Sequence, residues 1–122
     1  MTAKVSVWVQ REQRFKDNEF IVTRFDMSAV CAYAKHPETA EPYILMVSEF
    51  RSPVRNSKNV VLELPGGSSF NPKKNPLEIA CAEIREETGM VVSPDKLKFI
   101  GSSQSASTLS VHVVNLYSIE LS

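Results

Sequence analysis

The chain has 122 residues, of which 43% are apolar and 23% are charged, and this length and composition fit a single domain over residues 1–122. Fourteen basic and fourteen acidic residues cancel, so the total charge gives no reason to expect a nucleic-acid or membrane partner. The longest apolar runs are too short to cross a bilayer, and the N-terminus lacks the apolar core of a signal peptide. We therefore expect a soluble, cytoplasmic protein.

Short β-rich runs dominate the first half of the chain and predict antiparallel hairpins. They cover residues 5–9, 20–25, 29–34, 43–50 and 59–64. The same pattern returns near the end of the chain, at residues 97–101 and 111–121. Cys31 and Cys81 stand alone in apolar surroundings without metal-ligand spacing, so we interpret both as reduced packing residues.

One segment has a strong helical pattern. Asn75 can cap its N-terminus, Pro76 suits the first helical position and Glu78 completes a capping box, while Gly89 offers a left-handed stop. The face predicted to pack on the sheet holds Leu77, Ala80, Cys81, Ile84 and Thr88. The predicted class is therefore α+β, with one amphipathic helix on a mixed, mostly antiparallel sheet.

Three acidic residues, Glu83, Glu86 and Glu87, occupy the helical arc next to this apolar face. Glu83 and Glu87 are like charges at i and i+4, and all three lie in the last turns, where the helix dipole prefers cations, so each placement costs a few tenths of a kcal/mol. Helix stability therefore does not explain these three acids, and a bound cation explains them better. Hard divalent cations such as Mg²⁺ or Mn²⁺ take oxygen ligands of this kind.

A glycine pair, Gly66 and Gly67, follows the fifth predicted strand and precedes the helix. Glycine permits close approach of the main chain to a ligand, so a carbonyl of this pair could serve as a further metal ligand and Gly67 could lie against a substrate. The alternative is a simple turn that ends the strand.

Residues 64–67 (LPGG) and 80–90 (ACAEIREETGM) together resemble the Nudix box. That motif reads G, five residues, E, seven residues, and then R-E-U-x-E-E-x-G-U, where U is a bulky aliphatic residue. The resemblance implies an α/β/α Nudix-like sandwich that hydrolyses a nucleoside diphosphate linked to another moiety, with Mg²⁺ or Mn²⁺ as cofactor. It also implies that Glu83 and Glu87 are the main metal ligands, with Glu86 close by and the Gly66 carbonyl joining them.

The chain departs from the motif at three points. Ala82 stands where the motif has arginine, and Lys74 stands where the motif has its first glutamate. The stretch from Gly67 to Gly89 is one residue longer than in the motif. Arg85 cannot replace the missing arginine, because it faces away from the acids on the helix. Arg51 or Arg55 could supply the positive charge. The departures leave open a weakened enzyme or a module that binds a nucleotide without cleaving it.

Residues 47–54 (VSEFRSPV) and 62–66 (LELPG) are similar to the region before the box in ADP-ribose pyrophosphatases. That likeness implies that Arg51 contacts the substrate, with Arg55 nearby, and a guanidinium fork suits phosphate oxygens. It favours ADP-ribose or a related nucleotide sugar, giving a nucleoside monophosphate and a sugar phosphate. A nucleoside triphosphate pyrophosphatase of the same family is the alternative.

The N-terminal region holds the sole tryptophan, Trp8. The resemblance implies that it contacts the base of the nucleotide and that two chains pair through their N-terminal strands as a homodimer; a place in the core or at the dimer interface is the alternative for Trp8. The final helix usual in the family does not appear before Ser122. We expect either an abbreviated domain or a continuation, and the group that accepts the proton of the attacking water stays unassigned.

Overall fold

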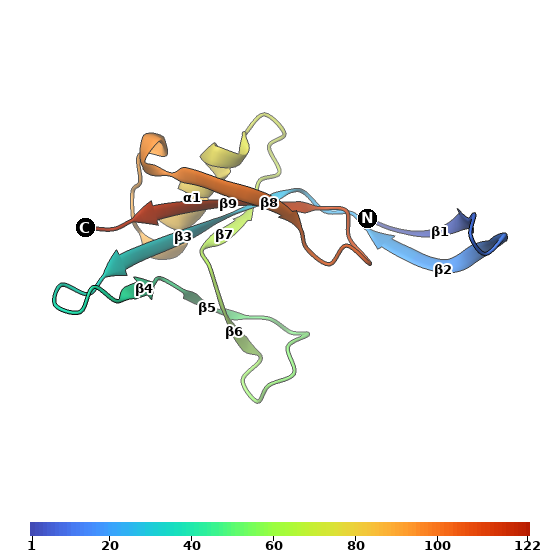
Figure 1. The fold of residues 1–122 in the computed structure, drawn as a ribbon, viewed down its shortest axis with the longest axis horizontal. Helices are drawn as coiled ribbons and strands as arrows, with labels where there is room; N and C mark the ends of the chain where they lie inside the picture. Colours follow the sequence, from blue (N-terminus) through green and yellow to red (C-terminus); the bar gives the residue numbers. More distant parts are fainter.

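The structure, a computed structural model, describes all residues from Met1 to Ser122. One α-helix, one short 3₁₀ helix and nine strands follow each other along the chain (Figure 1). Their bounds are β1 (Thr2–Val9), β2 (Arg14–Val22), β3 (Met27–Lys35), β4 (Pro42–Ile44), β5 (Val47–Phe50), β6 (Val60–Glu63), β7 (Gly66–Ser68), α1 (Pro76–Thr88), η1 (Pro94–Lys96), β8 (Lys98–Gln104) and β9 (Val113–Glu120).

The central sheet has the strand order β4-β3-β9-β8, and β7 also pairs with β3. β3 and β9 run parallel, with Met27 opposite Val114, and all other pairs in this sheet are antiparallel. The predicted mixed, mostly antiparallel sheet is confirmed. Two separate hairpins complete the molecule: β5 pairs with β6, and β1 pairs with β2 in an arm that extends away from the sheet (Figure 1).

The helix begins and ends where the sequence predicts. The Asn75 side chain accepts a hydrogen bond from the Glu78 N–H at 2.9 Å, and the Glu78 carboxylate accepts one from the Asn75 N–H at 3.0 Å. Gly89 has a φ of 77° and donates its N–H to the carbonyl of Arg85. The reciprocal cap satisfies two N–H groups that a helix terminus otherwise leaves without partners.

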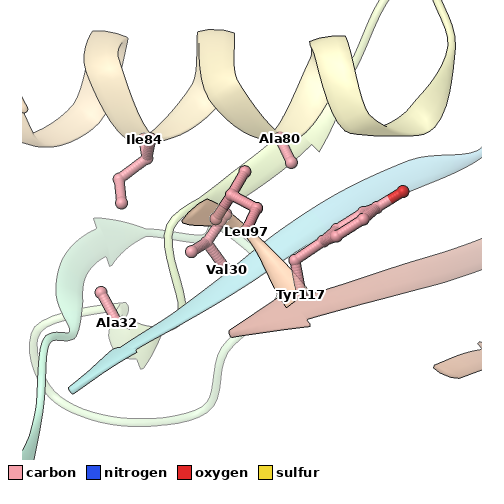
Figure 2. Packing of buried hydrophobic residues seen from close by; sticks show 6 residues of the cluster. All are labelled: Val30, Ala32, Ala80, Ile84, Leu97 and Tyr117. Atoms are coloured by element: carbon pink, nitrogen blue, oxygen red, sulfur yellow. The ribbon is translucent and has the colours of Figure 1, made fainter. Parts of the chain in front are cut away.

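The core lies between α1 and one face of the central sheet. Alternate residues of β3 point toward the helix, and Val30 and Ala32 are fully buried beneath Ala80 and Ile84 (Figure 2). Leu97 and Tyr117 close the cluster. At the start of the strand, the Ser28 hydroxyl donates to the Pro76 carbonyl at 2.7 Å and so ties β3 to the first turn of the helix.

The buried face of α1 is wider than predicted. Ile79 is buried, although the predicted face omits it, and it lies beside Met27 and Ser28 at the start of β3. Leu77 and Cys81, which the prediction includes, are only half-buried. Both cysteines are free thiols, and burial raises the pKa of Cys81.

Several predicted strands differ from the structure in extent. Residues 43–50, predicted as one strand, divide into β4, which pairs with β3, and β5, which pairs with β6. After β4, the Leu45 N–H still donates to the Ala32 carbonyl of β3 and its side chain packs against the core. Residues 66–68, predicted as a turn or a ligand loop, form β7 on the edge of β3. The strand predicted at 20–25 ends at Val22, whose partner across the hairpin is Thr2 near the chain start.

The β1–β2 arm carries aromatic side chains that nothing in the chain covers. Trp8 and Phe15 face each other across the strands, with ring centroids 5.0 Å apart, and Phe20 is also exposed. Elsewhere in the fold, no helix has the length and apolar character needed to cross a membrane.

Candidate functional site

Two adjacent glycines bring β7 into close contact with its neighbours on both sides. A Cβ atom at Gly66 would lie 2.7 Å from the Ser28 carbonyl oxygen and 2.9 Å from the Ala29 Cα. A Cβ atom at Gly67 would lie 2.6 Å from the carboxylate of Glu83. Gly66 therefore permits tight pairing with β3, whereas Gly67 provides the space in which the Glu83 carboxylate lies against the main chain.

Glu87 contacts the same strand as Glu83. The Gly66 N–H donates to Glu87 Oε2 at 2.9 Å. Glu83 and Glu87 are both half-buried, whereas Glu86, between them in the sequence, is exposed. Two of the three predicted acids thus meet the predicted glycines. The contact at Gly66 is made by its N–H, and the metal-ligand role predicted for its carbonyl stays a prediction.

The carboxylates at this strand carry charge under unfavourable conditions. The pKa of Glu83 is raised, first by burial and then by the charges of Glu86 and Glu87, with Lys74 acting in the opposite direction. The pKa of Glu87 is raised by burial, which outweighs the lowering effect of the Gly66 hydrogen bond. Neither Glu83 nor Glu87 forms an ion pair within the chain.

Nowhere in the structure does a group of three or more His, Cys, Asp or Glu side chains gather closely enough to hold a metal ion. The chemistry of the donor set nevertheless fits a hard divalent cation, because two carboxylates lie against the main chain of Gly66 and Gly67 and burial disfavours their charged forms, which a bound cation would stabilise. Glu86 would complete the set if its exposed side chain turned toward Glu83 and Glu87.

The β5–β6 hairpin places further charges near these acids. Arg51 makes a two-point contact with Glu63: its Nε donates to Oε1 at 3.0 Å and its Nη2 donates to Oε2 at 2.8 Å. This contact raises the pKa of Arg51 and lowers the pKa of Glu63. Glu49 and Glu63 both add to the upward shift in the pKa of Glu87, so the hairpin and the helix share one electrostatic environment.

An apolar cleft of about 360 Å³ begins beside the glycine strand. Ala29, which pairs with Gly66, and Leu64, which precedes it, belong to its wall. Five of its nine lining residues are hydrophobic, three are serines and none is charged. The other lining residues are Ile100, Gly101, Ser102, Ser103, Ser105, Val114 and Leu116.

The remaining predicted site residues lie apart from this group. Trp8 belongs to β1, in the projecting β1–β2 arm (Figure 1), and its indole N–H donates to the Gln10 side chain at 2.9 Å. Arg55 is exposed in the turn between β5 and β6 and forms no ion pair. Within one chain, the structure therefore brings five predicted site residues toward one region: Gly66, Gly67, Glu83, Glu87 and Arg51. Trp8 lies outside this region.

Glu49 and Glu63 also belong to this charged group, although the sequence alone does not indicate them. In the β5–β6 hairpin, Glu49 lies opposite Val61 and Glu63 lies opposite Val47. Because side chains alternate between the two faces of a strand, the two acids share a face. The alternation alone does not reveal this, because the register between the two strands must also be known.

No protein-family model matches the sequence, and no curated protein matches it. Solved structures with a similar fold do exist. The MERS1–RNA complex of T. brucei has a TM-score of 0.66 and 19% identity over 79% of this chain and 34% of that one. The MERS1–GDP complex of T. brucei has a TM-score of 0.62 and 20% identity over 79% of this chain and 33% of that one. A MutT/Nudix family protein from Enterococcus faecalis has a TM-score of 0.65 and 20% identity over 91% of this chain and 40% of that one.

These likenesses concern the fold. The chain has a mixed α+β architecture, with one helix on a mostly antiparallel sheet, that resembles the MutT/Nudix neighbour. The chain spans between 33% and 40% of the length of the three structures compared. The likeness therefore establishes the fold of this chain and not the activity of any of these proteins.

Proposed function

We propose that the protein hydrolyses a phosphoanhydride bond in a nucleoside diphosphate linked to a second moiety, with ADP-ribose or a related nucleotide sugar as substrate. The products would be a nucleoside monophosphate and a sugar phosphate. The observation that carries this proposal is the pair of half-buried carboxylates, Glu83 and Glu87, set against Gly66 and Gly67 and paired with no basic side chain. The likeness in fold to a MutT/Nudix protein supports it.

Glu83 and Glu87 would hold Mg²⁺ or Mn²⁺, with Glu86 turning inward and the Gly66 carbonyl as a further donor. When bound, a divalent ion supplies neutralisation of the diphosphate charge and activation of a water molecule. The Gly66 N–H holds Glu87 in place through its 2.9 Å hydrogen bond. Gly67 leaves Glu83 room to lie on the main chain, so both acids are preorganised by the same strand.

Arg51 would bind a phosphate of the substrate, with Arg55 as a second cation at the same hairpin. The cleft beside Ala29 and Leu64 would take the uncharged part of the substrate, because most of its lining is apolar and its serine hydroxyls can bond sugar or base atoms. Ala29 in the cleft wall pairs with Gly66, whose N–H binds Glu87, so a substrate held in the cleft would extend past this strand to bring its diphosphate to the acids.

The decisive experiment is a substrate screen with Mg²⁺ and with Mn²⁺, followed by Glu87→Gln. We expect turnover of ADP-ribose but not of dGTP, and a loss of about 100-fold or more in kcat for Glu87→Gln, since removing a group that stabilises transition-state charge costs this much. Glu41→Gln, a substitution of an exposed glutamate in the β3–β4 connection, is the matched control. Near-normal kcat in Glu87→Gln would overturn the metal assignment, and turnover of dGTP alone would favour a nucleoside triphosphate pyrophosphatase.

A second candidate function is binding of a nucleotide without cleavage. Ala82 and Lys74, which stand in place of the motif arginine and glutamate, favour it, and two of the similar folds are MERS1 complexes with RNA and with GDP. Calorimetric titration with GDP and with ADP-ribose separates the two functions. Measurable binding with no turnover of any nucleotide would support this candidate over the hydrolase.

The exposed arm is a proposed dimer element. An isolated two-stranded hairpin is marginal in water, and the aromatic side chains of β1 and β2 are uncovered. Sedimentation velocity on the wild type and on Phe20→Ser is the measurement. We expect the wild type to sediment as a homodimer and the variant to shift toward the monomer.

A further inference from the structure

We propose that Glu63 is a positioning residue for substrate binding: it fixes the guanidinium of Arg51 so that one edge of the group is presented to a substrate phosphate. This inference rests on the proposed function and deepens it. Glu63 is not one of the acids predicted to hold the metal. The only hydrogen bonds of its side chain are the two that it accepts from Arg51.

The geometry of the pair decides which edge is presented. A guanidinium has two edges that can each donate two parallel hydrogen bonds, namely the side edge (Nε and one terminal nitrogen) and the end edge (both terminal nitrogens). Glu63 takes the side edge, through Nε at 3.0 Å and Nη2 at 2.8 Å. The end edge makes no hydrogen bond within the chain, and its planar fork is left for an anion with phosphate geometry.

The backbone of Arg51 is fixed on both sides. Its N–H donates to the Asn59 carbonyl at 2.7 Å, and its carbonyl accepts from the Val54 N–H at 3.0 Å. The Asn59 side-chain amide donates to the Val54 carbonyl at 2.7 Å and so closes the turn between the strands. With the backbone held in this way, the main freedom left to Arg51 is the direction of its side chain, and that is the freedom removed by Glu63.

Charge at the site requires such a restraint. Glu49 and Glu87 both influence Arg51 electrostatically, so an unrestrained guanidinium would be drawn toward a carboxylate proposed to hold the metal. Glu63 competes for the arginine and keeps it from pairing with Glu87. The side chains of Arg51 and Glu63 are 48% and 36% exposed, and exposed pairs contribute little to stability. Because this pair is bidentate, a part in fold stability would show as a lower Tm in the variants below, whereas positioning of Arg51 shows in KM.

The test is a set of variants, Glu63→Gln, Glu63→Ala, Arg51→Ala and the double variant Arg51→Ala/Glu63→Ala, assayed with ADP-ribose. We expect Glu63→Gln to raise KM about 10-fold while kcat stays within about 2-fold and the Tm is nearly unchanged, because the substitution alters a charge-assisted contact and not the chemical step. The double variant should bind no more weakly than Arg51→Ala alone, since Glu63 acts through Arg51.

The matched control is Glu12→Gln, because Glu12 also accepts a hydrogen bond from an arginine Nε, that of Arg14, at 2.7 Å on the remote arm. It should leave KM unchanged. An unchanged KM in both Glu63 variants, or losses in the double variant that multiply, would overturn this inference alone, provided that turnover still depends on Glu87. A wild type that neither binds nor cleaves ADP-ribose would overturn the proposed function and this inference with it.

Discussion

The two ends of α1 are built on opposite principles. At the N-terminal end, Asn75, Pro76 and Glu78 each satisfy or remove a backbone donor, and the cap is complete. At the C-terminal end, two half-buried acids lie where the helix dipole disfavours negative charge, and their pKa values are raised. One end lowers the energy of the folded chain, and the other raises it.

This difference separates stability from function within thirteen helical residues. Substitutions at the capped end should lower the free energy of unfolding and leave turnover alone. Substitutions at the acidic end should lower turnover and leave the free energy of unfolding unchanged or higher, because functional residues are commonly kept at a cost in stability. A variant at either end that lowered both turnover and the free energy of unfolding would contradict this separation.

The largest expected effect is that of Gly67→Ala on turnover. The new Cβ would meet the Glu83 carboxylate at 2.6 Å, and because this carboxylate is the end of a flexible side chain, it can move away at little cost to the fold. We expect kcat to fall by about 100-fold, as for loss of one charge-stabilising group, while the free energy of unfolding measured in urea changes by less than about 1 kcal/mol.

Gly66→Ala is the matched control, because its new Cβ meets backbone that cannot swing away. The Ser28 carbonyl at 2.7 Å and the Ala29 Cα at 2.9 Å would have to shift. Overpacking of this kind costs about 1–3 kcal/mol, so this variant should lose stability first. If Gly67→Ala loses more stability than Gly66→Ala, the proposed arrangement of Glu83 is wrong.

The sequence predicted the features of α1 well because they are local. A capping box joins residues three apart, and the acidic arc follows from helical spacing, so both can be calculated from the chain in order. The pairing of Arg51 with Glu63 could not be predicted, because it depends on the register between β5 and β6. The parallel pairing of Met27 with Val114 joins segments far apart in the chain, and no local pattern specifies it.

Asn75→Ala tests the capped end and should have a smaller effect. Removing the side chain leaves the Glu78 N–H without its acceptor at 2.9 Å, and loss of such a cap typically costs about 1 kcal/mol. We expect a lower free energy of unfolding in urea and a kcat within about 2-fold of the wild type. A fall in kcat without a fall in stability would show that the two ends of the helix are not independent.

The smallest expected effect is a pH dependence of stability that Glu83→Gln reduces. Because the pKa values of Glu83 and Glu87 are raised on folding, the folded chain binds protons more tightly than the unfolded chain does. Stability should therefore fall as the pH rises from the pKa of an unfolded glutamate, about 4.3, toward the raised folded values. Glu63, whose pKa is lowered, acts in the opposite sense, and its contribution is lost as the pH falls through its folded pKa.

Urea unfolding of the metal-free protein between about pH 4 and pH 7.5 gives the measurement, since protonation differences between the two states set its slope. Glu83→Gln removes the penalised charge, so the variant should be the more stable protein near neutral pH and should match the wild type near the acidic limit. Added Mg²⁺ should then stabilise the wild type more than the variant, because a ligand stabilises the state that binds it. A wild type that is more stable than Glu83→Gln at neutral pH in the absence of metal would mean that the C-terminal acids of α1 are not strained by their setting.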